Sequence, residues 1–259
     1  MQIRFAKLSD KEHVLDFCKN TFPWGDYIQQ VWNFWYNEGY LLVFEKIIPV
    51  GLIHAYFYNS QVWIEGIRVD KNFRHQKIAT HLISKIEKIS KRNSVKFSYM
   101  LIDIQNIPSM NLAKSLGYRI NSKWNFYTLE PKKNSNFEIN FIDDLNKSLF
   151  PFYIDSWRWI PLTNKIILEL KKKNQIIESK IGNNLSIGII THSKHFEKTI
   201  LVTIYGFDKI CTDNILSYIQ NYASENHIER IQVLSPEKLL SEKDLDLKLE
   251  FNHMKKKLF

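Results

Sequence analysis

Seven consecutive residues, Arg74-His75-Gln76-Lys77-Ile78-Ala79-Thr80, constrain the fold of this chain more than any other stretch. They follow an apolar, strand-like run at 62–69 and open a pattern in which apolar residues recur at helical spacing as far as about Lys91. A strand, a short loop and a helix in this order expose backbone N–H groups at the start of the helix. Those groups and the helix dipole favour an anion, typically a phosphate. The sequence therefore predicts an anion-binding junction.

The elements around this junction alternate between the two types of secondary structure. Turn signals such as Ile48-Pro49 and Asn59-Ser60 separate the strand patterns. We expect strands at 2–6, 40–45, 50–58, 62–69 and 97–102, helices at 9–20, 27–37, 78–91 and 108–115, and a terminal strand pair within 118–129. This order predicts an α/β fold of the α+β kind, with a mixed sheet and helices on both faces.

The second half of the chain repeats the first in outline. A polar, turn-rich linker at 130–136 precedes helical, strand, strand, strand, helix, strand and strand patterns. Ile210-Cys211-Thr212 answers Ile78-Ala79-Thr80, and Leu249-Glu250-Phe251 answers Leu116-Gly117-Tyr118. We expect two domains, 1–133 and 134–259, related by duplication. Two unrelated α+β domains are the alternative.

Charge and cysteine content narrow the class of protein. The 259 residues carry a net charge of +9, which suits an anionic ligand or nucleic acid. The lysine runs at 171–173 and 255–257 are typical of solvated surface, so nucleic acid is not expected. Two cysteines form neither a disulfide framework nor a metal cluster, and we expect no metal. No signal segment or spanning stretch is present, which predicts a soluble, cytoplasmic protein away from membranes.

The first half resembles the GNAT superfamily of acyl-CoA-dependent N-acyltransferases, over about residues 1–130. The resemblance lies in Trp63-Ile64-Glu65-Gly66-Ile67-Arg68-Val69-Asp70 and in the loop after it, where Arg74 and Ala79 match an Arg/Gln-x-x-Gly-x-Gly/Ala consensus. Lys77 occupies the first glycine position of that consensus. The resemblance implies that backbone groups of Ile67 and Val69 bind the pantetheine arm of coenzyme A. It implies that the pyrophosphate lies on the loop residues Arg74, His75, Gln76, Lys77, Ile78, Ala79 and Thr80.

A second family motif follows at the expected spacing. Asn106, Ser109, Leu112 and Leu116-Gly117-Tyr118 fit it, and the resemblance implies that Asn106 contacts coenzyme A. The second half resembles the same fold but lacks the site. Asp208 stands where an anion would approach, and like charges repel. We expect a degenerate GNAT-like second domain without its own acetyl-CoA site.

Two carboxylates are candidates for the catalytic base. Glu65 lies on the strand that leads into the loop, in register with Ile67 and Val69, and a carboxylate there could take a proton from an amine. A surface pair between Glu65 and Arg68 is the structural alternative. Asp26 is the weaker candidate, and attracting a cationic amine or capping a helix are its other possible roles. Ala113 occupies the position where many family members carry a tyrosine as acid for the thiolate.

The aromatic residues before the first strand hairpin allow two interpretations. Trp24, Tyr27, Trp32, Trp35 and Tyr36 could line an acceptor pocket, but helical spacing is more typical of core residues. The leading hypothesis is an N-acetyltransferase that uses acetyl-CoA as co-substrate and acts on a primary amine of a small molecule or amino acid. The alternatives are an acetyltransferase of protein or peptide amines, a catalytically silent module that binds coenzyme A, and a nucleic-acid-binding protein. The sequence does not indicate the oligomeric state.

Overall fold

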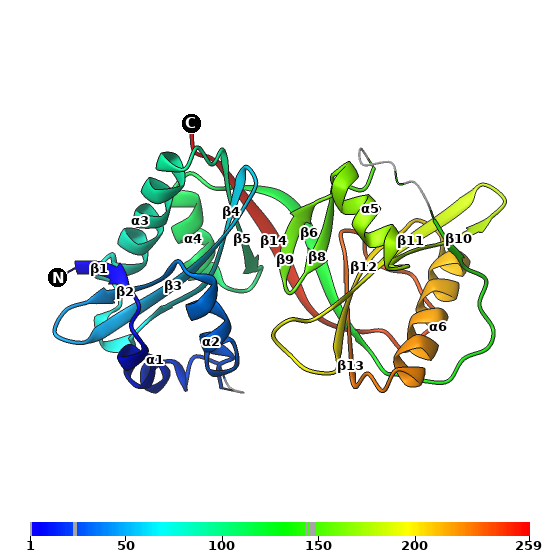
Figure 1. Cartoon of the computed structure of the whole chain (residues 1–259), viewed down its shortest axis with the longest axis horizontal. Helices are drawn as coiled ribbons and strands as arrows, with labels where there is room; N and C mark the ends of the chain where they lie inside the picture. The colour runs from blue at the N-terminus through cyan, green and yellow to red at the C-terminus, as the bar shows by residue number, and fades with distance from the viewer. Residues whose placement is uncertain (1, 23–24, 143–144, 146–148) are drawn as a thin grey trace. The chain divides into compact units, whose positions relative to one another are not determined.

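The computed structural model describes residues 2–22, 25–142, 145 and 149–259. The chain divides into two compact units: residues 1–121 with 253–259, and residues 122–252 (Figure 1). The predicted division at 133/134 differs from this one, because 122–133 lie in the second unit and 253–259 in the first. No helix among the described residues is long and apolar enough to cross a membrane.

The first unit is built on a mixed sheet, which confirms the predicted fold class. Its strands are β1 (Gln2–Phe5), β2 (Leu41–Glu45), β3 (Pro49–Tyr58), β4 (Gln61–Val69) and β5 (Phe97–Asp103). They lie in this order, and the last part of β14 (Asp246–Lys257) follows β5. Strands β1 to β4 are antiparallel, whereas β4 and β5 are parallel. The parallel pair requires a crossover, which α3 (Ile78–Arg92) supplies.

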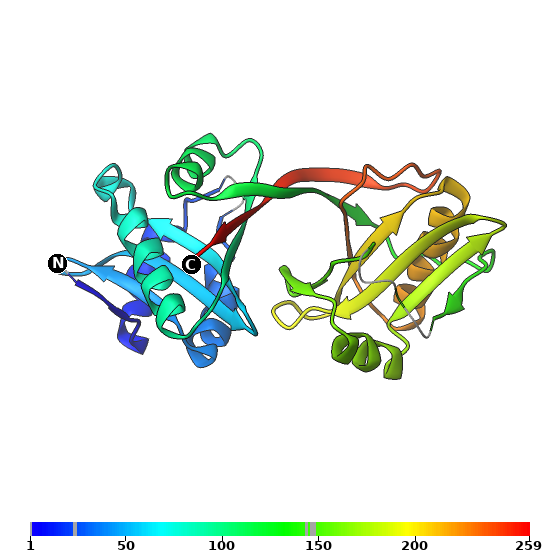
Figure 2. The same ribbon diagram turned by 90° about the horizontal axis from the view of Figure 1, so that it is seen from above.

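Helices cover both faces of this sheet (Figures 1 and 2). Ile53 of β3 packs in the core that contains Leu82 of α3. The next residue, His54, stacks on Trp35 of α2 (Ile28–Glu38). Because successive strand residues point to opposite faces, α2 and α3 lie on opposite sides of the sheet. The remaining helices of the unit are α1 (Lys11–Cys18) and α4 (Ile107–Ser115), with 3₁₀ turns at Leu8–Asp10 and Lys71–Phe73.

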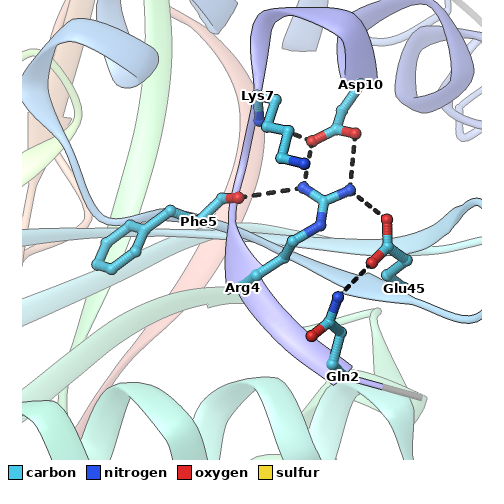
Figure 3. A network of polar contacts seen from close by, with 6 residues as sticks. All are labelled: Gln2, Arg4, Phe5, Lys7, Asp10 and Glu45. Atoms are coloured by element: carbon cyan, nitrogen blue, oxygen red, sulfur yellow. Dashed lines mark hydrogen bonds and ion pairs between the residues drawn. The ribbon is translucent and has the colours of Figure 1, made fainter.

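A polar network fixes the edge strand of the first unit (Figure 3). The Arg4 guanidinium donates to both Asp10 oxygens, at 2.7 and 3.0 Å, and also pairs with Glu45. Gln2 donates to the second Glu45 oxygen at 2.7 Å. The hydrogen bond from Arg4 lowers the pKa of Glu45 to about 2. These contacts join β1 to the following turn and to β2.

The C-terminal segment completes the first unit, which corrects the predicted strand pair at 118–129. That region forms one long strand, β6 (Arg119–Leu129), which pairs with β13 (Arg230–Ser235) from Asn125 onward. Met254 and Leu258 are buried in the core of the first unit instead, and the Leu258 N–H donates to the Lys96 carbonyl at 2.9 Å. A strand pattern predicts a strand but not its partner, so the pairing of β6 with the distant strand β13 could not be predicted.

The second unit repeats the central part of the first, in which three antiparallel strands are followed by a helix and a parallel strand. Strands β10 (Ile176–Ile181), β11 (Asn184–His192) and β12 (Thr199–Gly206) are antiparallel, and β12 is parallel to β13 across α6 (Lys209–Glu225). The other elements are α5 (Asn164–Lys172) and the short strands β7 (Asn140–Phe141), β8 (Phe152–Asp155) and β9 (Arg158–Pro161). One predicted echo is not structural, because Leu249-Glu250-Phe251 lies inside β14 whereas Leu116-Gly117-Tyr118 precedes β6.

Candidate active site

The loop before α3 presents open backbone amides, as the sequence predicted. Arg74, His75, Gln76 and Lys77 are exposed, and the described part of the chain offers no acceptor to their backbone N–H groups. His75 and Lys77 have positive φ angles of 63° and 58°, and Lys77 is the N-cap of α3. Lysine therefore adopts here the left-handed conformation that glycine adopts without strain. The first N–H groups of the helix, at Ile78, Ala79 and Thr80, lack intrahelical partners and extend this cradle.

The side of β4 that faces β5 becomes open next to this loop. The two strands pair at Gln61, Val62 and Trp63 with Phe97, Ser98 and Tyr99, and their ladder ends there. The Asp70 N–H donates to Val50 of β3 at 3.0 Å. Because backbone groups alternate along a strand, the N–H groups of Val69 and Ile67 point away from β3. These are the two residues to which the family resemblance assigns the pantetheine arm.

A bulge shapes β4 immediately before Ile67. Leu52 lies opposite Arg68, but His54 lies opposite Glu65, so β4 contains one extra residue. Gly66 at the bulge has a φ angle of +65°, and a Cβ there would lie 2.4 Å from Cζ3 of Trp35. Only glycine fits both the backbone conformation and the close approach of the indole. Trp35 therefore packs directly against the bulge, and it is a core residue, as is Trp32.

Glu65 is joined to a buried histidine that sequence reasoning missed. The Nδ1 atom of His54 lies 2.9 Å from Oε1 of Glu65, and its Nε2 lies 3.1 Å from the Gly39 carbonyl and 3.4 Å from Oε2 of Glu38. The imidazole is fully buried and stacks on Trp35, with ring centroids 4.7 Å apart. The Glu65 and Glu38 side chains are 12% and 20% exposed. The ligand atoms of Glu38, His54 and Glu65 lie within 4.8 Å of one another, but their spacing is that of hydrogen bonds.

Asp26 is engaged in a buried ion pair. Its carboxylate accepts from Nε and Nη2 of Arg68, at 2.6 and 3.1 Å, and also from the Ile28 N–H at the start of α2. Arg68 therefore pairs with Asp26, and Glu65 with His54. The guanidinium also lies over the rings of Phe22 and Tyr27. This arrangement favours Glu65 over Asp26 as the base. Trp24, from the same loop, lies outside the described residues.

Asn106 and the tyrosines near the site have structural partners. Oδ1 of Asn106 caps α4 by accepting from the Ser109 N–H at 3.2 Å, while the residue is exposed. Tyr118 shares a 2.7 Å hydrogen bond with Ser98 in the interior, and burial raises its pKa. Burial also raises the pKa of Tyr99, to about 12. Neither hydroxyl is suited to protonate a thiolate near neutral pH.

The corresponding helix start in the second unit is already occupied by a side chain. Asp208 caps α6 by accepting from the Cys211 N–H at 2.9 Å, and Asn184 donates to its other oxygen at 3.0 Å. A Cβ at Gly206 would lie 2.6 Å from Leu239, so the chain is also packed closely there. An internal carboxylate thus takes the place that an external anion would need.

Solved structures share this architecture over the whole chain. One is the structure of a protein from Thermoplasma acidophilum that is described as an acetyltransferase. It has a TM-score of 0.65 and 15% sequence identity, and the alignment covers 99% of this chain and 100% of that one. A GCN5-related N-acetyltransferase from Sphaerobacter thermophilus gives a TM-score of 0.66 at 10% identity, covering 99% and 95%. At these identities the likeness concerns the fold. No curated protein matches the chain.

The sequence itself matches one family model. Residues 10–118 match the acetyltransferase (GNAT) family. The match includes the loop at residues 74–77, Glu65, the bulge at Gly66 and the place where the β4–β5 ladder ends. Acetyltransferases of this family use acetyl-CoA. Residues 10–118 of this chain therefore match a GNAT-family acetyltransferase domain, and the protein is an acyltransferase.

Proposed function

We propose that the first unit transfers the acetyl group of acetyl-CoA to a primary amine of a small molecule or an amino acid. The observation that supports this proposal is that two stretches of backbone with outward-pointing N–H groups lie next to each other. The amides of residues 74–77 adjoin the part of β4 beyond the end of its ladder with β5, where the N–H groups of Ile67 and Val69 point away from β3; we assign the first to the pyrophosphate and the second to the pantetheine arm. Glu65 lies two residues before Ile67 on the same strand.

The chemistry follows from these positions. The amine nitrogen attacks the thioester carbonyl, a C–N bond forms, the C–S bond breaks, and coenzyme A leaves as a thiolate. Glu65 takes the proton that the nitrogen loses, and solvent returns a proton to the thiolate. Backbone N–H groups on the open side of β4 polarise the carbonyl as charge develops on its oxygen.

Calorimetry with acetyl-CoA, followed by a mass-spectrometric screen of amino acids, polyamines and peptides, tests the proposal. We expect binding, and acetylation of at least one amine. Glu65→Gln should retain acetyl-CoA binding but lose turnover by about 100-fold or more, the usual contribution of a general base. Glu12→Gln, at an exposed glutamate of the same unit, is the matched control. Failure to bind any acyl-CoA refutes the proposal, and acetylation of peptides alone would replace the acceptor class.

The buried tyrosines favour one second candidate. Ala113 is buried and both nearby phenols are engaged in the interior, so the described residues around α4 offer no tyrosine to the leaving thiolate. A module that binds coenzyme A without turnover is consistent with this. Binding without acetylation of any amine in the screen would support it.

We also propose that the second unit is a degenerate copy without its own acetyl-CoA site. The shared order of elements supports duplication, and the Asp208 cap supports loss of the anion cradle. One bound acetyl-CoA per chain in the calorimetric titration is the expected stoichiometry, and two would contradict it.

A further inference from the structure

We infer that His54 is a positioning residue for Glu65. It positions the carboxylate by holding one proton between its own Nδ1 and Oε1 of Glu65. The inference rests on the proposed role of Glu65 as base. It concerns the fully buried imidazole of His54, which lies on β3 opposite Glu65 of β4.

The tautomer of His54 is fixed by the backbone. Its Nε2 lies 3.1 Å from the Gly39 carbonyl oxygen, which can only accept a hydrogen bond. Nε2 must therefore carry a proton. Gly39 itself is held as the C-cap of α2, where its φ angle of +87° and ψ angle of 179° are accessible essentially to glycine alone. The position of this acceptor is thus built into the end of the helix.

The other ring nitrogen then requires a second proton. Nδ1 lies 2.9 Å from Oε1 of Glu65, and a lone pair facing a carboxylate at that distance would be repelled. One proton must lie between the two atoms. With that proton on Nδ1, Glu65 is a carboxylate held by a charge-assisted hydrogen bond, the stronger kind.

Two carboxylates flank the ring of His54. Glu65 on β4 and Glu38 on α2 place negative charge at its two ends, at 2.9 and 3.4 Å. Trp35 covers the ring with an interplanar angle of 4°, which restricts the rotation of the imidazole. The ring therefore gives Oε1 of Glu65 a buried hydrogen-bond partner in a defined position.

Other ionisable groups lie near Glu65 on the same face. Tyr27 interacts with the Glu65 charge, and burial raises the pKa of its phenol, so it stays neutral. The Asp26–Arg68 pair neutralises itself, with N–O distances of 2.6 and 3.1 Å. The charge that Glu65 meets on the β3 side is therefore that of His54.

Two amide substitutions separate positioning from packing. His54→Asn places an amide nitrogen where Nδ1 lies, so it can still donate to Glu65. His54→Gln places the nitrogen where Nε2 lies, so it can donate to Gly39 but not to Glu65. We expect kcat to fall less than about 10-fold for Asn and about 100-fold for Gln, because misplacing a catalytic group by about 1 Å costs that much. KM for acetyl-CoA should stay unchanged in both, since residues 74–80 are untouched. A Gln variant as active as the Asn variant would overturn the inference.

A spectroscopic measurement tests the inference without turnover. In the full-length protein labelled with ¹⁵N-histidine, with the His54 signals assigned through their loss in His54→Asn, we expect both ring nitrogens to be protonated at neutral pH. In Glu65→Gln, Nδ1 should lose its proton and Nε2 should keep it. An unprotonated Nδ1 in the parent, or one that ignores Glu65→Gln, refutes the inference. If no amine is acetylated, the proposed function fails, and this measurement still decides the role of His54.

Discussion

Gly66 is the residue at which the structure makes its sharpest energetic prediction. An alanine there would place Cβ 2.4 and 2.5 Å from two ring atoms of Trp35, whereas carbon atoms in contact lie about 3.5–4.0 Å apart. The φ angle of +65° adds about 1–2 kcal/mol for any residue with a Cβ. Overpacking a rigid core adds typically about 1–3 kcal/mol. Gly66→Ala should therefore lower the free energy of unfolding by about 3 kcal/mol.

A matched glycine isolates the steric part of this effect. Gly117 has a comparable φ angle of +88°, but its Cβ would meet only Cε of Lys256, at an ordinary 3.8 Å. Gly117→Ala should thus cost only the conformational term, about 1–2 kcal/mol. Urea unfolding followed by circular dichroism measures both. Equal destabilisation by the two substitutions would mean that Trp35 does not constrain the bulge.

Gly66→Ala should also affect catalysis. The indole that it displaces is the ring that stacks on His54. We expect kcat of the folded Gly66→Ala protein to fall while its affinity for acetyl-CoA changes little. Unchanged kcat would separate the bulge from the Glu65 network and refute this part of the reasoning.

Three further predictions concern the loop, the edge strand and the C-terminal segment. Lys77→Ala should weaken the affinity for acetyl-CoA in calorimetry because it removes a cation. Lys77→Gly should have a milder effect because glycine relieves the positive φ angle of 58°. An affinity in Lys77→Ala equal to that of the parent would mean that only the backbone of the loop binds. Arg4→Met should destabilise the protein above pH 4.5, because the lowered pKa of Glu45 favours the folded state only while Glu45 is ionised. The difference in urea midpoint between variant and parent should therefore shrink as the pH falls toward 2, and a pH-independent difference would contradict this. Met254→Ala should cost about 2–5 kcal/mol, whereas Leu247→Ala, at a half-exposed position of the same strand, should cost less than about 1 kcal/mol; equal costs would place Met254 outside the core.

Local patterns predicted the part of the site that depends on neighbouring residues. The strand at 62–69 and the helix start at Ile78 are confirmed, because apolar spacing and the loop between them are read within one short window. Lys77, at the first glycine position of the consensus, has a left-handed backbone conformation.

The partner of Glu65 could have been found by counting. The turn at Asn59-Ser60 sets Tyr58 opposite Gln61, and counting back along both strands sets His54 opposite Glu65. The bulge at Gly66 comes only after this pair, so it does not disturb the count. The stacking of Trp35 and the Asp26–Arg68 pair could not be derived in this way, since both depend on how α2 packs on the sheet.

The place of the last residues in the first unit has a consequence for synthesis. Leu258 bonds Lys96 across 162 positions, and Met254 and Leu258 belong to a core whose other members all precede residue 119. When the ribosome has released Glu65 and the loop at residues 74–77, the sheet that carries them still lacks the last part of β14. Contacts this distant in sequence form slowly, and an unpaired strand edge invites association with other chains. The nascent acetyltransferase unit thus spends the whole translation of the second unit with β5 uncovered, and acquires its complete core only when residues 253–258 emerge.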